Sequence, residues 1–307
     1  MTFDRSTTRA YRWALAVLVL GLLLGPVPAL HAQRPAPTAG SPPDSTAEGG
    51  VPHGTLMIVG GWEGASIRRR FADLAGGAEA DVVCVPTALP AARLTGWCRQ
   101  FFRTAGIPRR NRTVLHTRKP KKANRESFVE PLRTADAVWF TGGRQWRLVE
   151  AYAGTRTLEA FHDVLERGGA IGGTSAGASI QGSFLVRGDP RSKRIVVGRY
   201  TDGFGFLPRS AIDQHIRARG RETDLVPVIE ERPHLLGVGV DENTAAVVRG
   251  DTLRVIGEGI VTIYDARRWQ AADPPLPDAE KPLALRPGDR FNLRTRTVLS
   301  APEPADE

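Results

Sequence analysis

The chain has 307 residues, of which 41% are hydrophobic, and its formal net charge at pH 7 is +9. This length and apolar content suffice for one large α/β domain or two small ones, and the glycines and prolines follow no repeat, which excludes a collagen-like fibre. Much of the positive charge lies in residues 109–125, where no aromatic side chain is interleaved for base stacking. We therefore expect a solvated surface loop there and no nucleic-acid partner.

The first 32 residues are predicted to form a secretory signal peptide. Three arginines precede an apolar run from Trp13 to Leu24, and small residues follow near Ala32. The run has about 12 residues, whereas a membrane-spanning helix needs about 20. We expect cleavage, export to the periplasm or the exterior, and no membrane contact of the mature chain; a retained anchor is the alternative.

Two further segments are expected to lie outside the fold. Residues 33–53 are rich in Pro, Ala, Ser, Thr and Gly and are interpreted as a flexible linker. Residues 301–307 are acidic and are interpreted as a loose tail. A single α/β domain is therefore predicted for residues 54–300.

The two cysteines, Cys84 and Cys98, do not have the spacing of a metal site. An exported protein could oxidise them to a disulfide. Cys84 lies in an apolar, strand-like run, however, and buried free thiols are the favoured interpretation.

Short β-branched runs alternate with segments of helical spacing in the first part of the domain. The strand-like runs are Thr55–Val59, Asp81–Pro86, Thr113–His116, Ala137–Thr141 and Ala170–Gly172. Apolar residues recur at helical spacing in Ala91–Ala105 and Arg147–Leu165. This alternation predicts a mostly parallel sheet flanked by helices, with ligands bound beyond the carboxyl ends of the strands. Glycine pairs at 60–61 and 142–143 follow two of these strands and are placed to form a site.

The last third of the domain is predicted to add antiparallel hairpins to the sheet. Its strand-like runs are separated by short polar turns: Leu235–Val240, Ala245–Val248, Leu253–Ile256 and Ile260–Tyr264.

Ser175 is the candidate nucleophile. It lies in Gly173-Thr174-Ser175-Ala176-Gly177, a G-x-S-x-G pattern that follows an apolar strand. Such a turn exposes the serine hydroxyl on a sharp bend and directs nearby backbone N–H groups at developing negative charge. The pattern alone is weak, because glycine-rich turns of this kind also bind phosphate.

A serine nucleophile needs a general base, and His215 is the candidate because it follows two polar residues and precedes three arginines at alternate positions. An acid must hold the imidazole in the correct tautomer. Glu242, at the end of an apolar strand, is the first candidate, and Asp189 is the second.

Together these motifs resemble the cyanophycinases of peptidase family S51, in particular their exported bacterial members. The matching segments occur in one order: Phe140–Gln145, GTSAGAS at 173–179, DQH at 213–215 and GVGVDENTA at 237–245. The resemblance implies an α/β fold like that of class I glutamine amidotransferases, which is flavodoxin-like, and of aspartyl dipeptidase. It also implies a serine peptidase that releases β-Asp-Arg from cyanophycin, a polyaspartate chain carrying arginine on each side-chain carboxyl. A homodimer is a further implication. We expect no metal or organic cofactor, because a triad and an oxyanion hole supply the nucleophile, the base and the charge stabilisation themselves.

The resemblance also implies residue roles. Ser175 would be the nucleophile, His215 the base and Glu242 the third member, with Asp189 near the acid of the dipeptidase branch. Two backbone groups would form the oxyanion hole, those of Gly143 and Ala176. Five residues match substrate-binding positions: Gln145, Asp213, Gln214, Arg219 and Arg221.

One residue departs from the family pattern. Asp224 lies near a position where the family carries an arginine, and an acid there would weaken a carboxylate clamp formed by Arg219 and Arg221. Asp213 is expected to accept the substrate guanidinium. Other β-aspartyl or acidic peptides are therefore alternative substrates. An aspartyl dipeptidase-like exopeptidase and a non-catalytic binding protein on the same scaffold are alternative functions.

Overall fold

A computed structural model describes residues 49–90 and 94–299. The predicted signal peptide, residues 33–48 of the predicted linker and the acidic tail lie outside these ranges. None of the helices within them is long and apolar enough to cross a bilayer.

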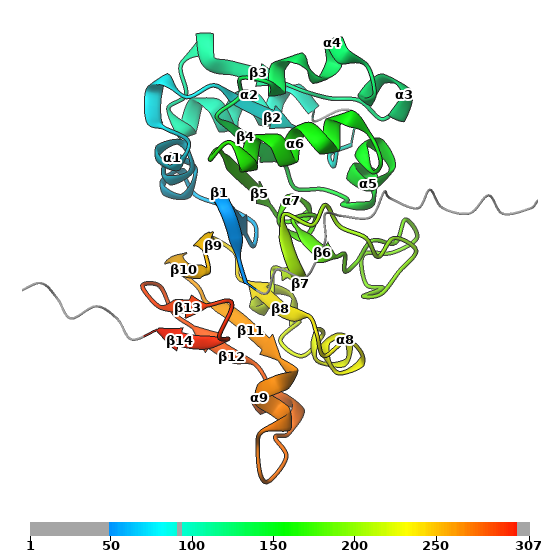
Figure 1. Ribbon diagram of the computed structural model, residues 1–307, viewed down its shortest axis with the longest axis vertical. Coiled ribbons are helices and arrows are strands. Elements are labelled where there is room, and N and C mark those ends of the chain that lie inside the picture. Colours follow the sequence, from blue (N-terminus) through cyan, green and yellow to red (C-terminus); the bar gives the residue numbers. More distant parts are fainter. Residues whose placement is uncertain (1–48, 91–93, 300–307) are drawn as a thin grey trace, which may run out of the picture. The chain divides into compact units, whose positions relative to one another are not determined.

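The main sheet has nine strands, and its five parallel strands form one half (Figure 1). In spatial order these are β1 (Val51–Val59), β5 (Ala170–Thr174), β4 (Ala137–Phe140), β2 (Val82–Val85) and β3 (Arg112–Val114). The other half extends antiparallel from β1 through β9 (Thr244–Gly250), β10 (Thr252–Gly257), β13 (Arg290–Asn292) and β14 (Thr297–Leu299). The predicted α/β class with its parallel sheet and added antiparallel strands is confirmed. Strand β1 begins before the predicted domain start, and Val51 pairs with Gly250, so residues 51–53 belong to the sheet and not to the linker.

A second sheet of five strands was not expected. Its spatial order is β12 (Leu283–Leu285), β11 (Val261–Asp265), β8 (Leu236–Val240), β7 (Leu207–Gln214) and β6 (Gly182–Phe184). The prediction that β8 and β11 join the main sheet is therefore wrong. Strand β8 pairs parallel with β7, and its glycines permit close packing: a Cβ at Gly237 would lie 2.8 Å from Cβ of Tyr264.

Side chains of the parallel strands alternate between two apolar clusters, one on each face of the sheet. Leu56 and Ile58 pack in the cluster that includes α5 and α6, whereas Met57 and Val59 pack in the cluster that includes α1 and α2. Burial on both faces explains why β1, β2 and β4 are continuous apolar runs, whereas the edge strand β3 is partly exposed. The helices are α1 (Ala65–Leu74), α2 (Leu94–Ala105), α3 (Pro120–Ala123), α4 (Glu126–Val129), α5 (Trp146–Tyr152), α6 (Arg156–Glu166), α7 (Ala176–Ser179), α8 (Val226–Glu231) and α9 (Ala266–Gln270).

Helices α5 and α6 replace the single helix expected over Arg147–Leu165. Gly154, with φ +65°, lies between them in a left-handed conformation that an α-helix does not contain. The chain turns there, and both helices still pack against the sheet.

Cys84 and Cys98 form a disulfide, with a Cα–Cα distance of 6.0 Å. The preference for free thiols was therefore wrong. Cys84 points from β2 to the face of the sheet that α2 covers, and both residues are fully buried in that cluster. The bond joins the helix to the sheet.

The prediction of a surface loop over the basic segment 109–125 is wrong. It contains β3 and α3, and several of its cations have partners within the protein. Arg110 pairs with Glu79, Arg118 donates to the Leu89 carbonyl, and the Lys122 ammonium lies over the Phe128 ring.

Candidate active site

Ser175 lies in a strained turn between β5 and α7, with φ 54° and ψ −110°. The flanking glycines are required by close backbone contacts. A Cβ at Gly173 would lie 2.3 Å from the Gly177 carbonyl oxygen, and one at Gly177 would lie 2.2 Å from that of Phe140. The Ser175 N–H donates to the Val59 carbonyl at 2.9 Å, which fixes the bend against β1. The G-x-S-x-G pattern therefore has the strand-turn-helix context that exposes a nucleophile.

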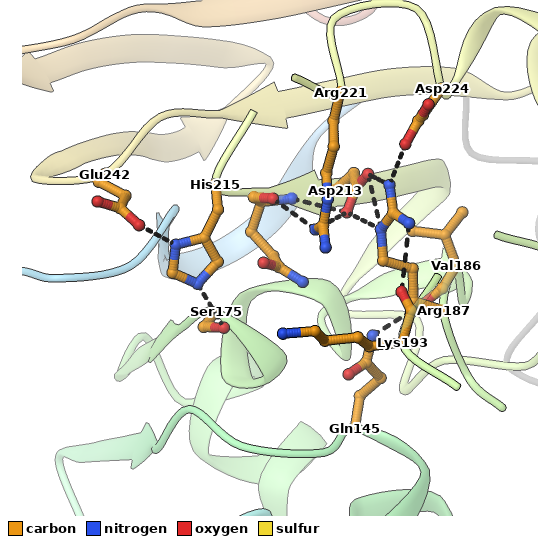
Figure 2. Close-up of polar contacts among 11 residues, drawn as sticks. Gln145, Ser175, Val186, Arg187, Lys193, Asp213, His215, Arg221, Asp224 and Glu242 are labelled. Atoms are coloured by element: carbon orange, nitrogen blue, oxygen red, sulfur yellow. Dashed lines mark hydrogen bonds and ion pairs between the residues drawn. The ribbon is translucent and has the colours of Figure 1, made fainter. Parts of the chain in front are cut away.

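His215 and Glu242 complete a hydrogen-bonded chain with Ser175 (Figure 2). His215 lies directly after β7, and its Nε2 is 2.9 Å from Ser175 Oγ. Its Nδ1 is 2.5 Å from Oε1 of Glu242, which follows β8. The two sheets thus bring together three residues from separate parts of the chain, in the arrangement of a catalytic triad.

Asp189, the second candidate for the acid, does not contact His215. Its buried carboxylate accepts hydrogen bonds from the Arg191 side chain and from the backbone N–H groups of Arg191 and Arg199. These bonds hold the pKa of Asp189 well below its usual range, the Arg191 side chain being the main cause. Asp189 therefore organises the loop of residues 187–200, and Glu242 is the acid at the imidazole.

The glycine pair at 60–61 positions both the base and the acid. The Gly60 carbonyl accepts the His215 N–H at 3.1 Å, and the Gly61 carbonyl accepts the Asn243 N–H at 2.8 Å. Neither glycine could carry a side chain in this place, because a Cβ at Gly60 would lie 2.1 Å from the carbonyl oxygen of Asp241. The end of β1 thus joins the ends of β7 and β8.

The imidazole of His215 is held in its neutral form. Burial, followed by the nearby Arg219 guanidinium, lowers its pKa to about 4, and these effects outweigh the opposing influence of Glu242. A neutral imidazole with Nδ1–H donated to Glu242 leaves Nε2 free to accept the Ser175 proton.

The two residues expected to form an oxyanion hole both lie beside Ser175. Ala176 is the first residue of α7, and an N–H in the first turn of a helix has no acceptor within that helix. Gly143 has φ +137°, and a Cβ there would lie 2.2 Å from the Ala88 carbonyl oxygen. The preceding Gly142 lies close to Ser175, since a Cβ added at this glycine would lie 3.3 Å from the serine Cβ.

A cavity of about 680 Å³ opens at Ser175 and His215. Four of the five residues expected to bind substrate line it: Gln145, Gln214, Arg219 and Arg221. Sequence reasoning missed other lining residues, among them Trp62, Arg187 and Lys193. Trp62 is 77% exposed and has φ +47°, but neither property has a signal in the sequence.

Asp213 does not line the cavity and is not available for a substrate guanidinium. It is fully buried and accepts hydrogen bonds from Arg187 Nε and Nη2 at 2.7–3.1 Å, with Arg221 Nη1 at 3.5 Å (Figure 2). Asp224 also has an internal role, because its carboxylate accepts from Arg187 Nη2 at 2.6 Å. Asp224 therefore anchors an arginine of the cavity wall, and its effect on carboxylate binding by Arg219 and Arg221 stays a prediction.

The fold and the Ser175–His215–Glu242 chain define an α/β serine hydrolase. Residues 56–256 match the model of peptidase family S51, and the chain belongs to this family of serine peptidases. Three cyanophycinases are similar along 80% of this chain. They come from Geminocystis herdmanii (30% identity, 96% of its length), a Nostoc species (32%, 88%) and Synechococcus elongatus (33%, 81%).

A solved structure supports the fold. The peptidase from an acI-B1 Actinobacterium superimposes with a TM-score of 0.60 at 20% identity, covering 80% of this chain and 98% of its own. At this identity the likeness establishes the shared fold alone.

Proposed function

We propose that this peptidase hydrolyses β-aspartyl peptides, with cyanophycin as its substrate, through an acyl-enzyme on Ser175. The observation that carries the proposal is the hydrogen-bonded chain Glu242–His215–Ser175 at the wall of a cavity lined by arginines. The similarity to cyanophycinases supports the choice of substrate.

In the acylation step, Ser175 Oγ attacks the carbonyl carbon of the scissile amide while His215 Nε2 takes the hydroxyl proton. The N–H groups of Gly143 and Ala176 donate to the resulting oxyanion. His215 then gives the proton to the leaving nitrogen, and the C–N bond breaks to leave an ester on Ser175. Glu242 holds Nδ1–H and stabilises the transient imidazolium.

Deacylation repeats these steps with water. His215 accepts a proton from the water that attacks the ester carbonyl, and the same N–H groups stabilise the second oxyanion. The proton returns to Ser175 Oγ as the ester bond breaks. A free carboxylate is released and the enzyme is restored.

Arg219, Arg221 and Gln214 are proposed to bind the substrate beside the scissile bond. Guanidinium groups match carboxylates in geometry and charge. The buried Oε1 of Gln214 has no hydrogen-bond partner among the described residues and is available to accept a substrate N–H. With Asp213 taken by Arg187, Gln214 is the acceptor that we assign to the substrate guanidinium or amide.

We also propose that the chain is exported after cleavage near Ala32 and that it acts as a homodimer. The Cys84–Cys98 disulfide supports export, because disulfides persist mainly in oxidising compartments. The homodimer is proposed from the family resemblance alone. N-terminal sequencing of the protein recovered outside the cytoplasm, and light scattering of the purified protein, test the two points.

The substrate is tested by incubating insoluble cyanophycin with the wild-type chain and with Ser175→Ala, and by measuring the released dipeptide by mass spectrometry. Release of β-Asp-Arg by the wild type alone is the expected result. Labelling of Ser175 by a fluorophosphonate without release would retain the peptidase chemistry and reject cyanophycin. Release by both proteins would reject Ser175 as the nucleophile.

A further inference from the structure

The cavity at Ser175 has an excess of positive charge. Six basic side chains line it: Arg68, Arg144, Arg187, Lys193, Arg219 and Arg221. Glu63 is the acidic residue of its lining among the described residues, and it is buried. Its carboxylate already pairs with Arg68 at 3.2 Å and accepts from the Thr174 hydroxyl at 2.7 Å.

The neighbouring carboxylates are likewise occupied by internal partners. Asp213 and Asp224 pair with Arg187, and Glu242 is bonded to His215. Arg221 is anchored by the Gln214 carbonyl and Asp213. Within the described ranges, each acidic side chain around the cavity therefore has a partner in the protein. Part of the positive charge of the cavity lining has no acidic partner in these ranges.

Arg144, Lys193 and Arg219 carry this remaining charge. Arg144 donates to the carbonyls of Asp189 and Pro190. Lys193 and Arg219 are exposed, and in the described part of the chain neither terminal group has an ion pair or hydrogen bond with a carboxylate, although the Glu242 carboxylate lies near enough to attract Arg219. Figure 2 shows the Lys193 side chain extending toward Ser175 and His215. A flexible lysine directed into a cavity whose acidic lining residue, Glu63, is already paired has an unsatisfied preference for an anion.

The loop that carries Lys193 is held in place by specific contacts. The Lys193 carbonyl accepts from Arg187 Nη1 at 3.3 Å, and Arg144 donates to the Asp189 carbonyl at 3.2 Å. Inside the loop, the Asp189 carboxylate binds the N–H groups of Arg191 and Arg199. The backbone of Lys193 is thus fixed at the cavity by the same arginine that neutralises Asp213.

We propose that Lys193 is a specificity-determining residue that, together with Arg219, binds the free carboxylate of the arginine residue in a β-Asp-Arg unit. This inference rests on the function proposed above and adds that the enzyme recognises the arginine carboxylate of the substrate. Every repeat of cyanophycin carries this carboxylate, because arginine is attached through its amino group. Among the described residues, the hydrogen-bonded chain of Ser175, His215 and Glu242 does not include Lys193, so we assign Lys193 to binding and not to the proton transfers.

The experiment measures binding, so that it does not depend on turnover. The Ser175→Ala protein is titrated calorimetrically with β-Asp-Arg and with the same dipeptide whose arginine carboxylate is a carboxamide. We expect the acid to bind roughly tenfold more tightly than the amide, as for a partly exposed charge-assisted hydrogen bond. Lys193→Gln should weaken acid binding roughly tenfold and leave amide binding unchanged, and Lys193→Arg should retain most of the affinity.

Arg194→Gln is the matched control. Arg194 is exposed on the same loop and carries the same charge, but it is not among the residues that line the cavity. If Arg194→Gln and Lys193→Gln weaken acid binding equally, only net charge matters and the proposal is wrong. Equal binding of acid and amide also overturns it.

The outcome is separable from that of the proposed function. Release of β-Asp-Arg from cyanophycin by the wild type, with equal binding of acid and amide, rejects the Lys193 inference alone. Binding of neither ligand, together with absence of release, rejects both the substrate and the inference. Fluorophosphonate labelling of Ser175 in the wild type then still reports the peptidase chemistry.

Discussion

Gly61 lies directly against the imidazole of His215: a Cβ atom at position 61 would stand 2.1 Å from Cε1 of the ring and 2.7 Å from each ring nitrogen. Gly61→Ala must therefore displace the ring from Ser175. We expect kcat to fall by roughly 100-fold, because displacements of about 1 Å have effects of this size on catalysis. The rate of fluorophosphonate labelling of Ser175 measures the loss.

Gly77→Ala is the control for backbone strain. Gly77 also has a positive φ, +79°, but a Cβ there meets no atom within 4 Å. The Gly77→Ala substitution should lower the stability of the fold slightly and leave the rate of Ser175 labelling unchanged. Equal labelling rates in Gly61→Ala and the wild type would contradict the assigned position of the imidazole.

Glu242→Gln tests which acid orients His215. The amide can donate to Nδ1 and so stabilise the wrong tautomer, and we expect kcat to fall by roughly 10³- to 10⁴-fold. Asp189→Asn should instead loosen the 187–200 loop, raising KM with a much smaller change in kcat. Steady-state kinetics of both variants separate the two roles. A larger loss of kcat in Asp189→Asn would reverse the assignment.

The pH dependence of kcat/KM reports the pKa of His215 in the free enzyme. Because burial and Arg219 lower that pKa to about 4, the base stays neutral through the mildly acidic range and activity should fall only as the pH drops through about 4. Arg219→Gln removes one cause of the lowering and should move the acidic limb to higher pH. If the acidic limb of the wild type lies at or above 6.5, the ordinary histidine pKa, then the pKa of His215 is not lowered and the prediction is wrong.

Removal of the disulfide should destabilise the fold without disturbing the active site. Cys84 and Cys98 are 14 residues apart, and closing a loop of this length in the unfolded chain is associated with about 3 kcal/mol of stability. Cys84→Ala/Cys98→Ala should lower the free energy of unfolding in urea by about this amount. The initial labelling rate of Ser175 in the absence of urea should match the wild type. An unchanged urea midpoint would mean that the bond contributes nothing.

Several features could be predicted because they depend on short stretches of sequence. Alternating β-branched and helical segments indicate a parallel sheet, and the glycines around Ser175 indicate a sharp turn, since both signals come from local backbone preferences. The order of the motifs also led from Ser175 to His215 and Glu242, residues that the fold brings into one hydrogen-bonded chain.

Local sequence patterns could not predict which distant segments pair with one another. The sequence could not separate β8 and β11 from the main sheet, because an apolar run fits either sheet equally well. It left Glu242 and Asp189 as alternatives, and it assigned Asp213 to substrate, because the charge of a carboxylate does not reveal which arginine lies beside it. The partner of Asp213 is Arg187, which lies 26 residues away in the chain.

The sequence by itself therefore determined the class of fold, the nucleophile turn and the candidates for base and acid, all of which follow from local geometry and motif order. The tertiary structure alone decided the Cys84–Cys98 bond, the neutralisation of Asp213 and the exposure of Lys193 at the cavity. The physical reason is that disulfides, buried ion pairs and cavities depend on which surfaces pack together, and packing joins residues irrespective of their separation in the chain.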